Sequence, residues 1–296
     1  MIKITVPATS ANLGPGFDCL GLALDLYNDF YVEEIDEGLV IEGCLEEFKN
    51  ENNLFYVSLK KALSELNEAV KGLKIVFDSR IPLKGGLGSS ATCIIGGILG
   101  AFAIKGIEVD NDKVLKIAKT IENHPDNIVP ALLGGITVAV IEDDKVYYEK
   151  FTTSESFEFI ALSPDIELST EEARRILPKN ISLVDGVYNV SRAALLAMAL
   201  SKGNKENIAV ACNDKFHQNY RGQLIPDFFE ILKFAKENGA ITSFLSGAGP
   251  TIMIINEKEN SILHEKLEKY LSTCERKWKM SVLNLEKDGA KINNCK

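Results

Sequence analysis

The apolar positions of this chain repeat with two different periods, and each period predicts one kind of element. Apolar and polar residues alternate over residues 2–6 and 73–77, as in strands with one buried face. Residues 91–104 are almost entirely apolar, which predicts a buried helix that is too short for a membrane span. Apolar side chains spaced three and four residues apart predict amphipathic helices over residues 112–121 and 228–235.

The end of the chain predicts a compact α+β unit. After the helix over residues 228–235, two apolar strands follow over residues 240–245 and 251–255, joined by a glycine-containing turn. A helix over residues 262–271 and a last strand near residues 281–285 complete the unit. The chain as a whole therefore belongs to the α+β class.

The length of 296 residues exceeds what one hydrophobic core usually spans, and we expect one or two domains of ordinary size. Residues 155–158 follow a strand around residues 147–150 and provide the boundary, with an N-terminal domain over residues 1–153 and a C-terminal domain over residues 154–296. No linker rich in proline or glycine separates the halves, so we expect them to share a cleft.

The formal net charge is −9, and no basic strip alternates with aromatic residues, which argues against nucleic acid as a partner. The cysteines have no close pair and predict reduced thiols in the cytoplasm, with no disulfide framework and no zinc site. They are Cys19, Cys44, Cys93, Cys212, Cys274 and Cys295. A catalytic thiol is disfavoured at Cys19, because the adjacent Asp18 would raise its pKa. The first residues lead directly into a strand, so we expect no leader segment and no membrane association.

A glycine-rich loop over residues 82–92, Pro-Leu-Lys-Gly-Gly-Leu-Gly-Ser-Ser-Ala-Thr, lies between a predicted strand and a predicted helix. Such a loop presents free backbone N–H groups and the positive end of the helix dipole to an anion, which suits a di- or triphosphate. The hydroxyl groups of Ser89, Ser90 and Thr92 could ligate Mg²⁺ beside the phosphates, or simply cap the helix. A tight turn without any ligand is the alternative. The loop fits neither the Walker A pattern nor the dinucleotide fingerprint.

Two further segments place polar side chains on rigid connections. Asn12 and Asp18 lie in a turn rich in glycine and proline after the first strand. Residues 122–127, Glu-Asn-His-Pro-Asp-Asn, follow the helix over residues 112–121, for which Asp112 is the predicted N-cap. The proline should end the helix and leave the chain extended. Each segment alone would be an ordinary turn or a solvated acidic surface, and together with the loop they predict substrate contacts.

The second half adds two arginines suited to a carboxylate. Ser169 begins a capping-box pattern, and the short helix that it starts carries Arg174. Arg221 follows later in the chain. The planar guanidinium group can donate two parallel hydrogen bonds to a carboxylate. A solvated surface position is the alternative for either arginine, and it is the better interpretation of Arg175.

The four segments, in their order, resemble the GHMP kinase family. Residues 82–91 match its loop Pro-x-x-x-Gly-Leu-Gly-Ser-Ser-Ala at every fixed position, and the turn over residues 246–251 resembles its third motif. Residues 7–18 and 122–127 are similar to the homoserine kinase branch, although Asn123 stands where glycine is usual. Asparagine tolerates the left-handed conformation, so the turn should persist. The resemblance implies an N-terminal domain like ribosomal protein S5 domain 2, with a left-handed βαβ unit, and a ferredoxin-like C-terminal domain.

The resemblance also implies a function, the phosphorylation of L-homoserine by ATP and Mg²⁺ in threonine biosynthesis. It implies that the nucleotide contacts Asn53 through adenine and the loop residues Pro82, Leu83, Lys84, Gly85, Gly86, Leu87, Gly88, Ser89, Ser90, Ala91 and Thr92. It assigns Ser90 and Glu122 to Mg²⁺. It assigns the substrate to Asn12, Asp18, His124, Asp126, Asn127, Thr170, Arg174, Arg221 and Gly247. The resemblance assigns catalytic roles to Ser90, Glu122, Asp18 and Asn127.

Within these assignments, the arginines would hold the substrate carboxylate and Asp126 its ammonium group. Asp18 and Asn127 would orient the hydroxyl. Asp18 could accept the hydroxyl proton, or the proton could pass to phosphate without a protein base. A related kinase for another alcohol and a non-catalytic sensor of nucleotide or amino acid are the alternatives. A homodimer is expected.

Overall fold

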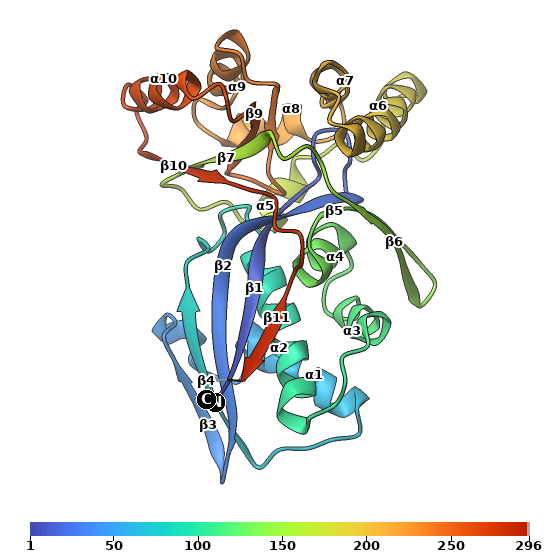
Figure 1. Cartoon of the computed structure of the whole chain (residues 1–296), viewed down its shortest axis with the longest axis vertical. Coiled ribbons are helices and arrows are strands. Elements are labelled where there is room, and N and C mark those ends of the chain that lie inside the picture. Colours follow the sequence, from blue (N-terminus) through green and yellow to red (C-terminus); the bar gives the residue numbers. More distant parts are fainter. Residues whose placement is uncertain (295–296) are drawn as a thin grey trace.

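The structure is a computed structural model that describes residues 1–294. It consists of two halves, and each half has one β-sheet with helices packed on it (Figure 1). The strands are β1 (Ile2–Ala11), β2 (Leu20–Ile35), β3 (Gly38–Glu42), β4 (Gly72–Ser79), β5 (Ile136–Glu142), β6 (Lys145–Phe151), β7 (Phe157–Pro164), β8 (Thr242–Leu245), β9 (Ile252–Glu257), β10 (Trp278–Leu283) and β11 (Lys291–Asn294).

Ten α-helices and two short 3₁₀ helices are present among the described residues. The α-helices are α1 (Leu54–Glu65), α2 (Ser89–Lys105), α3 (Asn111–Ala118), α4 (Pro125–Leu133), α5 (Thr170–Arg175), α6 (Leu183–Lys202), α7 (Lys205–Ala211), α8 (Gln218–Arg221), α9 (Phe228–Glu237) and α10 (Ile262–Leu271). The 3₁₀ helices are η1 (Glu46–Phe48) and η2 (Gly222–Leu224).

The first sheet has the strand order β11-β1-β2-β4-β3, and β5 joins it by pairing with β2 and β6. Its pairs are antiparallel except β3 and β4, which run parallel and are connected through α1. Helices α1 to α4 lie against one face of this sheet (Figure 1). The apolar α2 is the centre of that packing, because Ile95, Ile98 and Phe102 are fully buried between the sheet and the other helices.

The second sheet has the order β10-β7-β9-β8, with all pairs antiparallel. If the four strands of this sheet are numbered by their order in the sequence, from β7 to β10, their order across the sheet is 4-1-3-2, which is the arrangement of a ferredoxin-like sheet. The predicted helices and strands from residue 228 to residue 271 are confirmed within two residues at each end. The predicted ferredoxin-like fold of the C-terminal half is therefore confirmed.

The two halves share a hydrophobic cluster. Leu22 and Ile136 from the first sheet pack in it with Phe159 and Met253 from the second. Because this contact fixes the two sheets relative to each other, loops from both halves can build one site. The domain boundary at residues 153 and 154 stays a prediction, and the last strand, β11, pairs with β1 in the first sheet.

Two local predictions were wrong. Asp110, and not Asp112, is the N-cap of α3, since its carboxylate accepts hydrogen bonds from the backbone N–H groups of residues 112 and 113. The chain does not become extended after His124. A new helix, α4, begins at Pro125, because proline is well suited to the first position of a helix, where its missing N–H group is not needed.

Candidate active site

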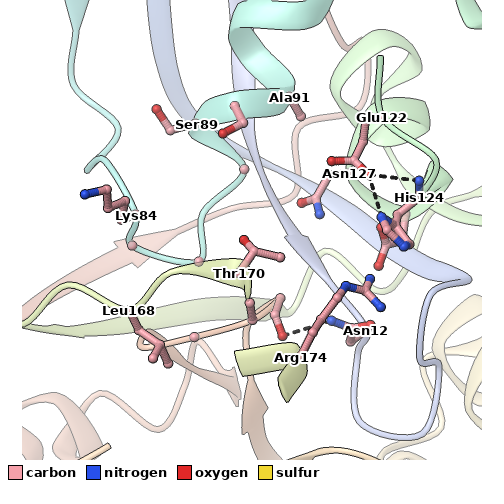
Figure 2. Close-up of a pocket in the computed structure, with 18 of the residues that line it drawn as sticks. Asn12, Lys84, Ser89, Ala91, Glu122, His124, Asn127, Leu168, Thr170 and Arg174 are labelled. Atoms are coloured by element: carbon pink, nitrogen blue, oxygen red, sulfur yellow. Dashed lines mark hydrogen bonds and ion pairs between the residues drawn. The ribbon is translucent and has the colours of Figure 1, made fainter. Parts of the chain in front are cut away.

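Most of the predicted site residues line one pocket between the two halves (Figure 2). Lys84, Ser89 and Ala91 lie on one side of it, and Thr170 and Arg174 lie opposite. The predicted residues that line the pocket are Asn12, Asp18, Lys84, Gly85, Gly86, Gly88, Ser89, Ser90, Ala91, Glu122, His124, Asp126, Asn127, Thr170, Arg174, Arg221 and Gly247. Leu168, Ala248 and Gly249 line it as well and were not predicted.

Five predicted nucleotide contacts are not among the lining residues. Asn53 is buried, and its amide caps α1 by accepting from Phe55 N at 3.0 Å while donating to the carbonyl of Phe48 at 2.9 Å. Its polar atoms are therefore used within the fold, and its contact with adenine stays a prediction. The hydroxyl of Thr92 is likewise buried and donates to the Ser89 carbonyl at 2.8 Å. The remaining three are Pro82, Leu83 and Leu87.

The glycine-rich loop lines one side of the pocket, the side predicted to bind phosphate. Gly86 and Gly88 have left-handed φ angles of 75° and 69°, and Gly88 is the N-cap of α2. A Cβ atom on Gly88 would lie 1.9 Å from Thr9 Oγ1, and one on Gly86 would lie 2.6 Å from the Ser246 carbonyl oxygen. Only glycine permits this close packing, so the first-turn N–H groups of α2 face the pocket without a side chain in front of them.

The turn over residues 246–249 holds the two halves of the site together. Ser246 Oγ lies 2.6 Å from the Gly86 carbonyl oxygen, which ties the turn to the phosphate loop. Asn12 Nδ2 donates to the Gly247 carbonyl at 2.9 Å, and Asn12 Oδ1 accepts from the backbone N–H of Asp18 at 2.9 Å. The turn that resembles the third motif therefore lies against the glycine-rich loop.

Glu122 and His124 form a pair in the turn between α3 and α4 (Figure 2). His124 Nδ1 lies 2.5 Å from Glu122 Oε1, and the backbone N–H of His124 donates to the same oxygen at 3.1 Å. Burial acts to raise the pKa of Glu122, but the bonds from His124 outweigh it and leave the pKa below its usual value. The same bond raises the pKa of His124. Glu122 is thus held as a carboxylate at the edge of the pocket.

Asp126 lies at the start of α4 and is only 2% exposed. Its Oδ1 atom is buried and has no hydrogen-bond partner in the described chain. Burial, and then the negative charge of Asp18, raise the pKa of this carboxyl to about 7. A buried carboxylate without a partner is costly, so a cationic ligand beside Asp126 would be strongly favoured.

Arg174 reaches from α5 to Asp18. Its Nη2 donates to Asp18 Oδ1 at 2.9 Å and its Nη1 to Asp18 Oδ2 at 3.3 Å, a bidentate pair that is about one third exposed on both sides. The Nε atom of Arg174 is buried and has no partner in the described residues. The guanidinium group therefore keeps a buried N–H donor that no other described residue uses.

Arg221, at the end of α8, is the largest fully buried side chain of the described protein. Its Nε donates to the Ala173 carbonyl at 3.0 Å and its Nη1 to the Gly247 carbonyl at 3.1 Å. Burial, and then the positive charge of Arg174, lower its pKa to about 10, so it stays charged at neutral pH. A guanidinium group fixed in this way is a preorganised site for an anion.

Comparison with known proteins bears on the identity of the site. The model of the GHMP kinase N-terminal domain matches residues 53–135, and that of the GHMP kinase C-terminal domain matches residues 194–273. A homoserine kinase of Clostridium botulinum is 46% identical over all 296 residues, which are the full length of both proteins. One of Clostridium beijerinckii is 48% identical over 293 residues, 99% of this chain and 98% of the relative. The chain belongs to the homoserine kinases of the GHMP family.

Solved structures agree with this membership. A homoserine kinase from Cytophaga hutchinsonii superimposes with a TM-score of 0.90 at 27% identity, covering 99% of this chain and 97% of that chain. The mevalonate kinase of Methanococcus jannaschii gives 0.70 at 19% identity, over 96% and 98% of the two chains, and shows the common fold. The predicted GHMP kinase fold is confirmed, and as a kinase the chain uses ATP.

Sequence reasoning missed residues that position the members of this kinase site. Thr9 Oγ1, on β1, donates to Asn127 Oδ1 at 2.7 Å. With its oxygen held in this way, Asn127 presents its amide nitrogen to the pocket. Alternation along the first strand predicted a strand over residues 2–6 only, which ends before Thr9, whereas β1 continues to Ala11. The pairing joins residues 118 positions apart, and no local pattern could have revealed it.

A second group that was missed lies beneath the arginines. Arg174 and Arg221 have their guanidinium carbons 5.7 and 5.2 Å from the ring centroid of Phe17. Phe17 packs in turn on the buried ring of His217, whose Nε2 lies 2.9 Å from the Gly14 carbonyl oxygen. Asp214 accepts the backbone N–H groups of His217 and Gln218 at 2.8 and 2.7 Å, which fixes the start of α8. Both arginines thus rest on a rigid aromatic support.

The cysteines that the structure describes are free thiols. All five among residues 1–294 are free, and burial is the main reason that the pKa of each thiol is raised. The pKa of Cys19 rises to about 11, through burial and then through Asp126 and Asp18, which confirms the predicted direction. The sixth, Cys295, lies outside the described residues.

Proposed function

We propose that this chain transfers the γ-phosphoryl group of ATP to the side-chain hydroxyl of L-homoserine and produces O-phospho-L-homoserine. The observation that carries the proposal is the unpartnered, buried carboxylate of Asp126 in the same pocket as the two arginines. An α-amino acid has an ammonium group and a carboxylate, and these groups complement the two kinds of charge. Mevalonate and sugars have no ammonium group to pair with Asp126.

The phosphate loop would bind the nucleotide. The N–H groups at the start of α2 and the left-handed glycines before it would hold the phosphates, and the positive end of the helix dipole would favour their charge. This matters because the net charge of the chain is −9, and binding of an anion depends on local groups.

Mg²⁺ fits the same region. Among the described residues no three His, Cys, Asp or Glu side chains gather as a metal cluster, but Mg²⁺ bound with a nucleotide needs only one or two protein oxygens beside phosphate and water. The Ser90 hydroxyl and the ionised Glu122, both lining the pocket, would provide them. When bound, the ion would neutralise charge on the phosphates.

The substrate side would bind the amino acid by its charges. The carboxylate would accept hydrogen bonds from Arg221 and from the free Nε of Arg174, and the ammonium group would lie against Asp126. Thr170 and His124 line the same space. These contacts would direct the side-chain hydroxyl toward the phosphate loop.

The reacting hydroxyl would lie between Asp18 and Asn127. Asn127 would donate to the hydroxyl oxygen through its amide nitrogen, and that oxygen attacks the γ-phosphorus as the bond to the bridging oxygen of ADP breaks. The transition state of phosphoryl transfer is loose, so alignment and charge neutralisation supply most of the rate. The hydroxyl proton passes to Asp18 or to a phosphate oxygen, and both routes stay open.

The test is ADP release by the purified chain with ATP and Mg²⁺ in the presence of L-homoserine, mevalonate, galactose, L-serine or no acceptor. Turnover that depends on homoserine is the expected result. Turnover with another alcohol would keep the kinase and overturn the substrate contacts. Nucleotide binding without turnover on any acceptor would support a sensor instead. A cytoplasmic location and a place in threonine biosynthesis belong to the same proposal.

A further inference from the structure

Phe17 is an aromatic residue whose neighbours are charged. It is half-buried, yet it is absent from the three hydrophobic clusters of the described residues and from the apolar side chains packed against them. The guanidinium carbon of Arg221 lies 5.2 Å from its ring centroid, and that of Arg174 lies 5.7 Å from it. A cation is attracted to the negative face of an aromatic ring within about 6 Å of the centroid. In the described part of the chain, no other aromatic ring has two arginines this close.

The two guanidinium groups repel each other and are held unequally. Burial, and then the positive charge of Arg174, lower the pKa of Arg221. Arg221 is fixed by its two bonds to backbone carbonyls. Arg174 is about one third exposed, comes from a helix of six residues, and has Asp18 as its one ion-pair partner among the described residues. Figure 2 shows it extending from α5 toward the turn that carries His124. The position of Arg174 therefore depends most on Asp18 and Phe17.

The ring of Phe17 is itself fixed by His217, which is fully buried. The two ring centroids lie 5.2 Å apart, with the planes tilted by 31°. His217 Nε2 lies 2.9 Å from the Gly14 carbonyl oxygen, which can only accept, so Nε2 carries the proton. Burial lowers the pKa of His217, and the imidazole is neutral at neutral pH. The support behind Phe17 thus adds no third positive charge to those of the arginines.

We propose that Phe17 is a positioning residue that sets the separation of Arg174 and Arg221 and, through them, the preference of the pocket for a substrate with a carboxylate. The inference rests on the proposed function, in which the arginines bind the carboxylate of L-homoserine. Phe17 does not line the pocket, so its effect on the substrate passes through the arginines.

An aromatic ring suits this role better than another acidic side chain would. A second carboxylate would also attract both arginines, but it would accept hydrogen bonds from their N–H groups and compete with the substrate. Asp18 already takes Nη1 and Nη2 of Arg174. The face of the Phe17 ring attracts the guanidinium groups through its quadrupole and occupies none of their donors. The buried Nε of Arg174, which has no partner among the described residues, therefore stays free for the substrate.

The first test is steady-state kinetics of Phe17→Leu, which keeps an apolar side chain and removes the aromatic face. The KM for homoserine should rise about 10-fold or more, because two cation–π contacts are lost. The kcat and the KM for ATP should change by less than about threefold, since only binding of the carboxylate is weakened. The apparent affinity for L-homoserinol, which has an alcohol in place of the carboxylate, should change by less than about twofold, whether it is turned over or only competes.

Phe234→Leu is the matched control. Phe234 is also half-buried and also stacks on another ring, that of Tyr270, at 4.1 Å between centroids. Within residues 1–294 no cation lies over its ring. This substitution removes a comparable aromatic contact, so it should leave the KM for homoserine unchanged.

The second test separates the charge of the ring face from its volume. Phe17 is replaced by phenylalanine with one, two or three fluorine atoms on the ring, which withdraw charge from the face and change its size little. The KM for homoserine should rise with each added fluorine, by about tenfold over the series. A ring that only fills space would give the same KM throughout. This series also decides the question if Phe17→Leu does not fold.

The outcomes distinguish this inference from the proposed function. A wild-type chain that does not turn over homoserine would overturn the proposed function, and this inference with it, before any variant is compared. Turnover by the wild type with an unchanged KM in folded Phe17→Leu would overturn the inference alone. Equal losses of affinity for homoserine and homoserinol, or a constant KM across the fluorinated series, would do the same.

Discussion

The phosphate side and the substrate side of the pocket are built by different means. The phosphate side is a single segment, residues 82–92, and it offers mainly backbone N–H groups whose positions follow from glycine conformations. The substrate side combines charged side chains from four separate segments. These side chains are Asp18, Asp126, Arg174 and Arg221.

This difference has an energetic consequence. Backbone N–H groups at a helix start are present whether or not phosphate is bound, and water can satisfy them. Asp126 and Arg221 on the substrate side are buried, and the protein satisfies their charges unequally. Arg221 has two carbonyl partners, whereas Asp126 has a buried oxygen with none. Substitutions on the substrate side should therefore change both ligand affinity and stability, and those on the phosphate side should change mainly nucleotide affinity.

The largest expected effect comes from Arg221→Ala. Loss of two charge-assisted hydrogen bonds to the substrate carboxylate, at about 1.5–3 kcal/mol each, should lower kcat/KM for homoserine by roughly 10²- to 10⁴-fold. The KM for ATP should change little, because the phosphate side is a separate segment. Steady-state kinetics with each substrate varied in turn measures this split.

Arg175→Ala is the control for this substitution. Arg175 lies one residue after Arg174 but is exposed, and its only ion pair within residues 1–294 is with Glu171 on the same helix. Such pairs contribute little, so kinetics and stability should stay close to those of the wild type. Equal losses for homoserine and ATP in Arg221→Ala would contradict the assignment of Arg221 to the carboxylate.

The contrast between the two sides also explains what the sequence could predict. The phosphate loop is contiguous, and its glycines lie between a predicted strand and a predicted helix, so its conformation and its place in the fold could be predicted. Arg174 and Arg221 were predicted as site residues because family motifs surround them, and both line the pocket. Three features depend on contacts between distant segments and could not be predicted from local residue patterns. They are the packing of Phe17 against the arginines, the hydrogen bond from Thr9 to Asn127, and the pairing of β11 with β1. Asn53 caps α1, and its predicted contact with adenine stays a prediction, because a helix cap and a ligand contact call for the same kind of polar side chain.

Asp126→Asn should have the next largest effect. Removing the negative charge should lower kcat/KM for homoserine by roughly 10- to 100-fold, the contribution of one charge-assisted hydrogen bond. The free protein should become more stable near pH 8. The pKa of about 7 lies above the usual 3.8, so the fold favours the neutral acid and the ionised form costs stability at higher pH. Thermal unfolding at pH 8 measures the gain, and a loss of stability would show that Asp126 has a partner.

The pH dependence of the wild type follows from the same carboxyl group. In the free protein the raised pKa of about 7 means that Asp126 becomes neutral below that pH and cannot pair with an ammonium group. The value of kcat/KM for homoserine should therefore fall about tenfold per unit below pH 7. At saturating homoserine the ammonium group lowers this pKa, so kcat should hold to a lower pH. Asp126→Asn should lack this step, and an identical profile in that variant would assign the titration to another group.

The smallest effect tests whether the two sides are coupled through Thr9. Its hydroxyl holds the oxygen of Asn127, and its backbone N–H bonds to the Leu87 carbonyl of the phosphate loop at 3.2 Å. Thr9→Val removes only the hydroxyl bond, so Asn127 loses its fixed orientation and kcat should fall about 2- to 10-fold, the range of one neutral hydrogen bond. The KM for homoserine should change less, because the carboxylate and ammonium contacts persist. Thr9→Ser keeps the hydroxyl and should recover most of the rate. If Thr9→Ser and Thr9→Val lower kcat by the same factor, the loss comes from packing of the strand, and the orientation of Asn127 does not depend on the hydroxyl of Thr9.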